Sequence, residues 1–185
     1  TNKLSENSLN HLSLIELDFK DATKGNQYLF FNNCAIDITK NEIRKIDNSN
    51  VIVNVWADKV LDHNITLQEA HFKIDATDLN QCKIDILKTD NKFLNYLINT
   101  SRIHWKDDLE TPFLNDVNAK NEYFKQNQFN IKGSNLDQHK QQEQQQNLVN
   151  KVFALGYFLH KHKDSKNAYM IYAMDHRIGG VDESL

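Results

Sequence analysis

Two short basic clusters are the parts of the sequence whose residue types could do chemistry. The first is Arg102-Ile-His-Trp-Lys106, and the second comprises Lys161, Lys163 and Lys166. Arginine and lysine bind phosphate groups, and a tryptophan ring such as Trp105 stacks on nucleobases. Both clusters are therefore candidate nucleic-acid contacts. The structural alternative is that Trp105 packs in the core, its neighbouring cations cover a helix end, and the three lysines occupy a solvated turn.

The remaining residues of catalytic or metal-binding type form no recognisable pattern. His160 and His162 are two apart, so on a helix they would point to different sides and would be poor co-ligands. The zinc-protease, paired-cysteine and calcium-loop spacings do not occur. Asp107 and Asp108 are interpreted as a feature of a helix end rather than as catalytic carboxylates. The sequence therefore predicts no catalytic residue, no cofactor and no metal site in this chain.

The composition is that of an ordinary globular chain. Its 185 residues suffice for one domain or two small ones, and 39% of them are hydrophobic, which supports a core. The net charge is -3, so attraction to a polyanion would have to come from a local basic patch. No run of about 18 apolar residues occurs, so no membrane partner is expected. Cys34 and Cys82 lie far apart, as expected of two buried thiols in a reducing cytoplasm.

Alternating apolar and polar residues predict strands in the first half. Four short runs of this kind are separated by Asn-rich turns, which is typical of an antiparallel meander, at residues 28–31, 34–38, 42–46 and 51–56. Similar alternation at 72–75 and 82–87 predicts one or two further strands. Residues 1–21 fit either a short helix or an extended segment. We therefore expect a small antiparallel β-rich domain over residues 1–88.

Two helices are predicted in the second half. Asp90 is expected to cap the first, which runs from Asn91 to about Trp105 and whose apolar stripe contains Phe93, Leu94, Leu97, Ile98 and Ser101. The tract at 138–146 reads QHKQQEQQQ and consists of good helix formers. It is predicted to form the solvated first turns of a long helix that ends near His162, with disorder as the alternative. A helical domain with a polar Gln/Asn-rich segment is thus expected over residues 89–167.

Three stretches share the pattern of one known protein family, in the same order along the chain. They are Tyr28-Leu-Phe-Phe-Asn-Asn-Cys-Ala-Ile-Asp-Ile-Thr-Lys40, Asn99-Thr-Ser-Arg-Ile-His-Trp-Lys106, and the region from Val149 to Asp175 with its apolar helix and Ala168-Tyr-Met-Ile-Tyr-Ala-Met strand. Together they resemble the poxvirus-type primase-helicases of phages and Bacteroides-type bacteria, which belong with the superfamily 3 helicases. The third stretch resembles the region just before the Walker A loop of those proteins.

The chain departs from the family pattern at two points. Cys34 stands where the family has glycine, and the phosphate-loop lysine and Ser/Thr do not occur in this sequence. Without a lysine for the β- and γ-phosphates and a hydroxyl for Mg²⁺, ATP hydrolysis cannot be assigned to these residues. ATP and Mg²⁺ are therefore expected only for a longer parent protein, of which this chain, beginning at Thr1, is expected to be a piece.

The resemblance implies an α+β fold, in which a small antiparallel β-meander is followed by a helical part. Residues 168–185 would then begin a truncated P-loop ATPase domain. The implied function is that of a helicase-associated DNA-replication domain between a primase part and a ring-forming motor. Such a domain would bind single-stranded or forked DNA, help a hexamer assemble or couple primase to motor. The expected DNA-binding residues are Arg102, Trp105, Lys106, Lys161, Lys163 and Lys166.

Two other functions stay open at this point. One is a purely structural protein–protein interaction module that uses the aromatic meander and the long helix and binds no nucleic acid. The other is an independent enzyme, which would require Asp, Glu and His side chains to converge in one deep pocket.

Overall fold

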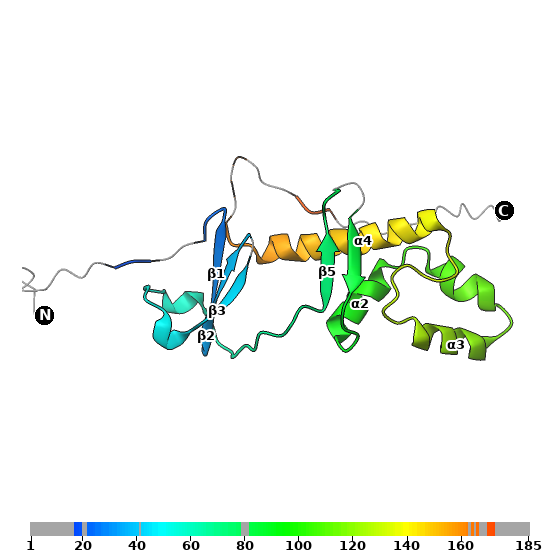
Figure 1. The fold of residues 1–185 in the computed structure, drawn as a ribbon, viewed down its shortest axis with the longest axis horizontal. Coiled ribbons are helices and arrows are strands. Elements are labelled where there is room, and N and C mark those ends of the chain that lie inside the picture. Colours follow the sequence, from blue (N-terminus) through cyan, green and yellow to red (C-terminus); the bar gives the residue numbers. More distant parts are fainter. Residues whose placement is uncertain are drawn as a thin grey trace, which may run out of the picture. The chain divides into compact units, whose positions relative to one another are not determined.

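The computed structural model describes most of the chain, namely residues 17–19, 22–40, 42–78, 82–162, 164, 166 and 170–172. Its described residues divide into two compact units (Figure 1). Unit 1 contains those of Thr1–Leu67 and Lys161–Lys166, and unit 2 contains those of Gln68–His160 and Asn167–Leu185. The secondary structure is a mixture of helices and a small sheet with antiparallel strands, as the α+β prediction requires.

Unit 1 is built on a four-stranded sheet with the strand order β3-β2-β1-β4. Here β1 (Asn26–Phe31), β2 (Cys34–Thr39) and β3 (Ile43–Asp47) pair antiparallel, which confirms the first three strands of the predicted meander. The two-residue β4 (Val60–Leu61) pairs with β1 in parallel. The sheet is therefore mixed rather than purely antiparallel.

The predicted fourth strand, at residues 51–56, is wrong. This run lies between the 3-10 turns η1 (Asn48–Asn50) and η2 (Ala57–Lys59), and Asn54 forms an isolated bridge with Phe19. Val51, Val53 and Val55 are half-buried and alternate with exposed residues such as Ile52, which is 94% exposed, so the run alternates in burial without forming a strand. Trp56 instead stacks on Phe19, with ring centroids 4.5 Å apart.

One face of the unit 1 sheet carries its core. Leu29, Phe31, Cys34, Ile36 and Ile38 pack there with Ile65. Gln27 lies on the same face of β1 as Leu29 and Phe31, because residues two apart in a strand point the same way, and it is 3% exposed. Its Oε1 accepts the backbone N–H of Lys161 at 2.6 Å. The 161–166 segment is therefore tied to the buried side of β1 by a hydrogen bond that spans most of the sequence.

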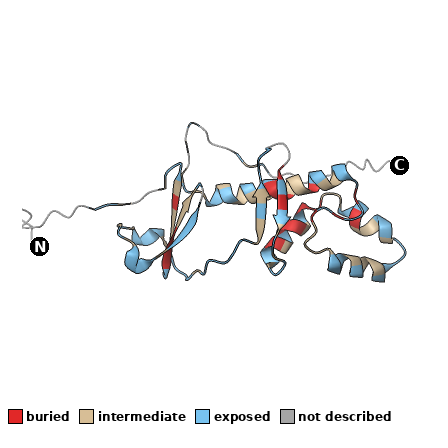
Figure 2. Cartoon of the chain, viewed as in Figure 1, coloured by how far each residue is buried: buried red, intermediate tan, exposed pale blue. Residues whose placement is uncertain are grey.

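Unit 2 packs a β-hairpin and a helix against the long helix α4 (Gln138–Leu159). The hairpin consists of β5 (Phe72–Asp75) and β6 (Lys83–Ile86), and the packed helix is α2 (Lys92–Ser101). The buried core lies where these elements meet, and it contains Cys82, Ile84, Leu94, Leu97, Ile98, Ile131, Leu148 and Val149 (Figure 2). The predicted domain boundary at residue 88 is therefore displaced, because the hairpin belongs to the helical unit.

The two predicted helices are present, with shifted ends. Asn91, not Asp90, caps α2, and its side chain accepts the N–H of Leu94 at 3.0 Å. The helix ends at Ser101 rather than near Trp105, and Phe93 is 58% exposed although it belongs to the predicted stripe. The Gln-rich tract does begin α4, with Asp137 as its cap.

Gln144 is an exception to the predicted solvated start of α4, because it is fully buried. Its Nε2 donates to the carbonyl of Ile131 at 2.9 Å, and its Oε1 accepts the backbone N–H of His104 at 3.1 Å. A buried amide is tolerated when its hydrogen bonds are made. Gln144 therefore joins α4 to the segment that follows α2.

The polar middle of the chain contains three short helical pieces, none of which the sequence patterns predicted. They are the single π-helical turn η3 (Lys106–Glu110), the 3-10 turn η4 (Thr111–Phe113) and α3 (Val117–Gln126). Pro112 lies at the start of η4, where its missing N–H is tolerated. Asp116 caps α3 by accepting the N–H of Ala119 at 2.9 Å.

The predicted strand at 168–174 and the predicted start of an ATPase domain at 168–185 lie largely outside the described residues. Residues 170–172 are described, and they belong to no strand. Among the described helices, none combines the length and apolar character needed to cross a membrane.

Candidate nucleic-acid interface

Arg102, the first residue of the first basic cluster, is buried rather than exposed. Its side chain is 2% exposed and donates from Nη1 to Oδ2 of Asp108 at 3.1 Å. Its Nη2 donates to the carbonyl of Asn127 at 2.6 Å. Burial lowers the pKa of Arg102, and the adjacent charge of Asp108 opposes that shift. Because the guanidinium is enclosed by protein, Arg102 is a structural residue in this fold and does not present its charge to a strand of DNA.

Asp108 is the centre of this buried network. Its Oδ1 accepts the hydroxyl of Tyr123 at 2.7 Å and the N–H of Asn135 at 3.3 Å, and its carbonyl accepts from the Asn135 amide at 2.9 Å. Burial, followed by the hydrogen bond to Asp108, raises the pKa of Tyr123. Asp108 thus joins η3, α3 and the loop before α4. The Asp107-Asp108 pair had only been interpreted as a helix-end feature, and nothing in its spacing distinguished the buried residue from the exposed one.

Gly133 allows this loop to approach Asp108. Its φ is +73°, and a Cβ built there would lie 2.8 Å from Cγ of Asp108. We expect Gly133→Ala to destabilise the protein by more than the roughly 1–2 kcal/mol of left-handed strain alone, because the carboxylate must also move. Gly156→Ala is the matched control. At Gly156 an added Cβ would meet no atom within 4 Å beyond the neighbouring backbone of its own helix. Removing a helical glycine there should stabilise by up to about 1 kcal/mol.

Thermal unfolding of the two alanine variants checks this prediction. The midpoint should fall for Gly133→Ala and rise slightly for Gly156→Ala. Equal shifts of the same sign in the two variants would contradict the proposed close approach at Gly133.

The segment after α2 is braced against the first turns of α4. Nε2 of His104 lies 2.7 Å from Oε2 of Glu143, and the His104 backbone N–H is held by the buried Gln144. Asp107 pairs with Lys140 at 2.6 Å, and this hydrogen bond lowers the pKa of Asp107. Together with Arg102 and Asp108, these contacts fix the backbone on both sides of Trp105.

Trp105 and Lys106 are the members of the first cluster that reach the surface. Trp105 is 42% exposed, and the Lys106 Nζ lies 5.7 Å from its ring centroid. The nearby carboxylates each have another partner, in the pairs Asp107–Lys140, Asp108–Arg102, Glu110–Lys120 and Glu143–His104. Within the described part of the chain, Lys106 makes no ion pair, so its charge is available to an anion.

The second cluster lies in unit 1. Lys161 and Lys166 are exposed, and the Lys166 backbone N–H donates to Oδ1 of Asp164 at 2.9 Å. Lys163 lies outside the described residues. The backbone of Lys161 is therefore held by its hydrogen bond to Gln27.

Among the residues that the structure describes, no group of three or more His, Cys, Asp or Glu side chains is placed to hold a metal ion. Cys34 and Cys82 are buried and form no disulfide.

No protein-family model, curated protein or solved structure matches this chain.

Proposed function

We propose that this chain is a nucleic-acid-binding domain of a replicative primase-helicase, without catalysis of its own, and that Trp105 and Lys106 contact a single strand or a fork. The observation that carries the proposal is an exposed tryptophan beside a lysine that forms no ion pair with the described residues, on a segment held in place by its neighbours' contacts. The wider context, with a hexameric parent that uses ATP and Mg²⁺, rests on the three stretches that resemble the primase-helicases.

The contacts around Trp105 favour binding, because ordering flexible groups when a ligand binds costs free energy. The residues that flank Trp105 in the sequence are held by the buried Arg102–Asp108 pair and by the His104–Glu143 contact. The backbone of Trp105 is therefore positioned before any ligand binds. Stacking of a base on an aromatic ring contributes roughly 1–3 kcal/mol. A single neighbouring lysine adds a salt-sensitive phosphate contact. The expected interaction is therefore weak, sequence-tolerant and strongest at low salt.

The test is fluorescence anisotropy with labelled single-stranded and forked DNA at low salt. We expect Trp105→Ala to weaken binding about tenfold. Lys106→Gln should lower the slope of log affinity against log salt by about 0.7, the value for one lost single-strand phosphate contact. The matched control is Trp56→Ala, because the Trp56 ring is 59% exposed but stacks on Phe19. Equal losses in the two tryptophan variants would contradict the assigned role of Trp105.

A second candidate function is a protein–protein interaction module, which the end of α4 favours. Phe153, Phe158 and Leu159 are each more than half exposed, so the last turns of the helix carry large apolar side chains that reach water. Wild-type protein that binds no DNA at low salt, but self-associates in light scattering, would favour this alternative over nucleic-acid binding.

A further inference from the structure

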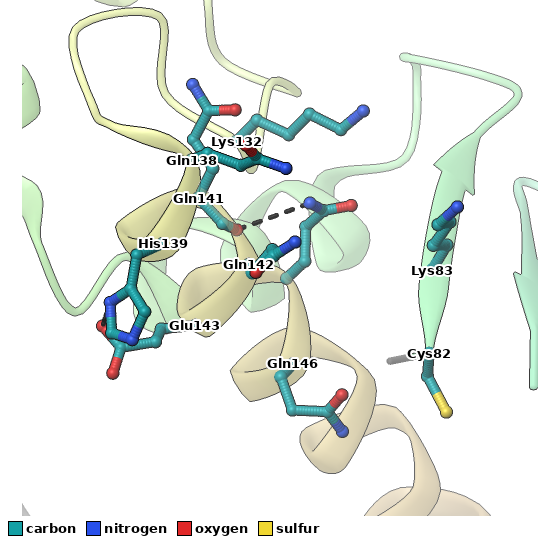
Figure 3. A pocket seen from close by; sticks show the side chains of 10 residues that line it. Cys82, Lys83, Lys132, Gln138, His139, Gln141, Gln142, Glu143 and Gln146 are labelled. Carbon is teal, nitrogen blue, oxygen red and sulfur yellow. Dashed lines mark hydrogen bonds and ion pairs between the residues drawn. The ribbon is translucent and has the colours of Figure 1, made fainter. Parts of the chain in front are cut away.

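Unit 2 has an open pocket that the sequence patterns did not indicate. It has a volume of about 450 Å³ and lies between the start of β6 and the first turns of α4 (Figure 3). Lys83 lines it from β6, Lys132 from the loop before α4, and most of the remaining wall consists of glutamines from α4. Residues that are about fifty positions apart in the sequence therefore meet around one cavity.

The charge of the pocket lining favours an anion. Lys83 and Lys132 are exposed and form no ion pair within the described part of the chain. Lys83 lies opposite Asp75 in the hairpin register, and its charge, after the hydrogen bonds from Thr77, helps to lower the pKa of Asp75, but Asp75 does not line the pocket. Glu143 is the acidic residue of the lining, and it is engaged by His104 at 2.7 Å and by His139 at 3.5 Å. The lining therefore holds two lysines and one carboxylate, which leaves an excess of positive charge.

The glutamines supply neutral donors beside these lysines. Gln141 is occupied, because its Nε2 donates to the carbonyls of Gly133 at 3.2 Å and Leu136 at 2.8 Å. Gln138 and Gln142 lie one helical turn apart in α4 and line the pocket, and their side-chain amides make no hydrogen bond within the described chain. Their amide groups can donate to a phosphate or sugar oxygen. The pocket thus combines a wall fixed by hydrogen bonds with donors that are open to a ligand.

The lining decides which part of a nucleic acid fits. A base is normally held by stacking on a large aromatic ring, and the lining contains no Phe, Tyr or Trp; its one ring is His139, whose Nδ1 lies 3.5 Å from Glu143. Point charges and amide donors suit phosphate oxygens instead. We propose that this pocket holds the backbone phosphates of a single nucleic-acid strand. The proposal rests on the nucleic-acid function above and adds a second contact on the same unit.

Glu143, in the first turns of α4, connects the pocket to the segment that carries Trp105 and Lys106. Glu143 lies on the pocket wall, and it accepts from His104, the residue just before Trp105. In this arrangement Trp105 stacks on a base of the strand while the pocket holds its phosphates. A free phosphate or nucleotide would offer the pocket the same oxygens as a strand does. The experiment therefore distinguishes a bound strand from a bound free anion.

The test compares the double variant Lys83→Gln/Lys132→Gln with Lys92→Gln/Lys125→Gln. The control removes two lysines that are exposed in the same unit, outside the pocket, so the change in net charge is identical. Binding of labelled oligothymidine is measured by anisotropy over a salt series, with circular dichroism as a check on folding. We expect the pocket variant to bind roughly tenfold more weakly and its salt slope to fall by about 1.4, while the control changes much less.

Three other outcomes would contradict the pocket proposal, and the last of them would also contradict the proposed function. If Trp105→Ala weakens binding but the pocket variant behaves as its control does, the pocket proposal fails and the proposed function stands. If calorimetry shows that inorganic phosphate binds the wild type but not the pocket variant, and oligothymidine affinity is unchanged, the pocket takes a free anion and not a strand. If wild-type protein binds no oligonucleotide at low salt, both proposals fail.

Discussion

Asp108→Ala is expected to destabilise unit 2 by about 3–5 kcal/mol, the usual cost of leaving one member of a buried ion pair alone. The Asp108 side chain is 1% exposed, and its removal leaves the Arg102 guanidinium, which is itself 2% exposed, without its carboxylate partner. It also removes the acceptor for the Tyr123 hydroxyl and the Asn135 N–H. The loss should appear in urea denaturation followed by the helical circular dichroism signal, because the described α-helices belong to unit 2.

The neighbouring residue provides the control. Asp107 is the same residue type and also forms an ion pair, at 2.6 Å from Lys140, but its side chain is 48% exposed. Exposed pairs contribute little to stability because water solvates both charges when the pair is broken. Asp107→Ala should therefore leave the urea midpoint nearly unchanged. Similar losses in the two variants would show that burial of the Arg102–Asp108 pair does not control the stability of this unit.

Leu148→Ala is expected to lower the free energy of unfolding by about 2–5 kcal/mol. Leu148 is fully buried in the core that α4 shares with α2 and the β-hairpin. Removing its side chain loses apolar burial and leaves a cavity that close-packed neighbours fill only partly. The change should be visible as a lower midpoint in the same urea titration.

The same helix contains the matched control for this substitution. Leu159 is the last residue of α4 and is 66% exposed, so Leu159→Ala removes the same atoms from a place that water already reaches. We expect its urea midpoint to stay within a small fraction of the shift for Leu148→Ala. A large loss at Leu159 would instead indicate that another surface covers the end of α4 in solution, as the interaction-module alternative requires.

Local periodicity predicted most of the regular elements. Alternation with short Asn-rich turns predicted β1, β2 and β3, and a three- and four-residue spacing predicted α2, because these patterns report which side of each element is buried. The same reasoning was wrong at residues 51–56, where the alternation is present but, within the described residues, Asn54 forms only an isolated bridge with Phe19. Alternation indicates that a strand is possible, while pairing depends on what lies beside it.

For the candidate site, the sequence determined that Trp105 and Lys106 are adjacent residues of a type that suits a nucleic-acid strand. Only the tertiary structure decided which cluster members are exposed. Arg102 and Lys106 have the same charge and differ by four positions, yet one is buried against Asp108 and the other lies beside an exposed ring. The pocket is likewise tertiary, since it requires Lys83 and Lys132 to meet beside α4. Charge and propensity are properties of each residue, whereas burial and pairing depend on distant segments that fold against it.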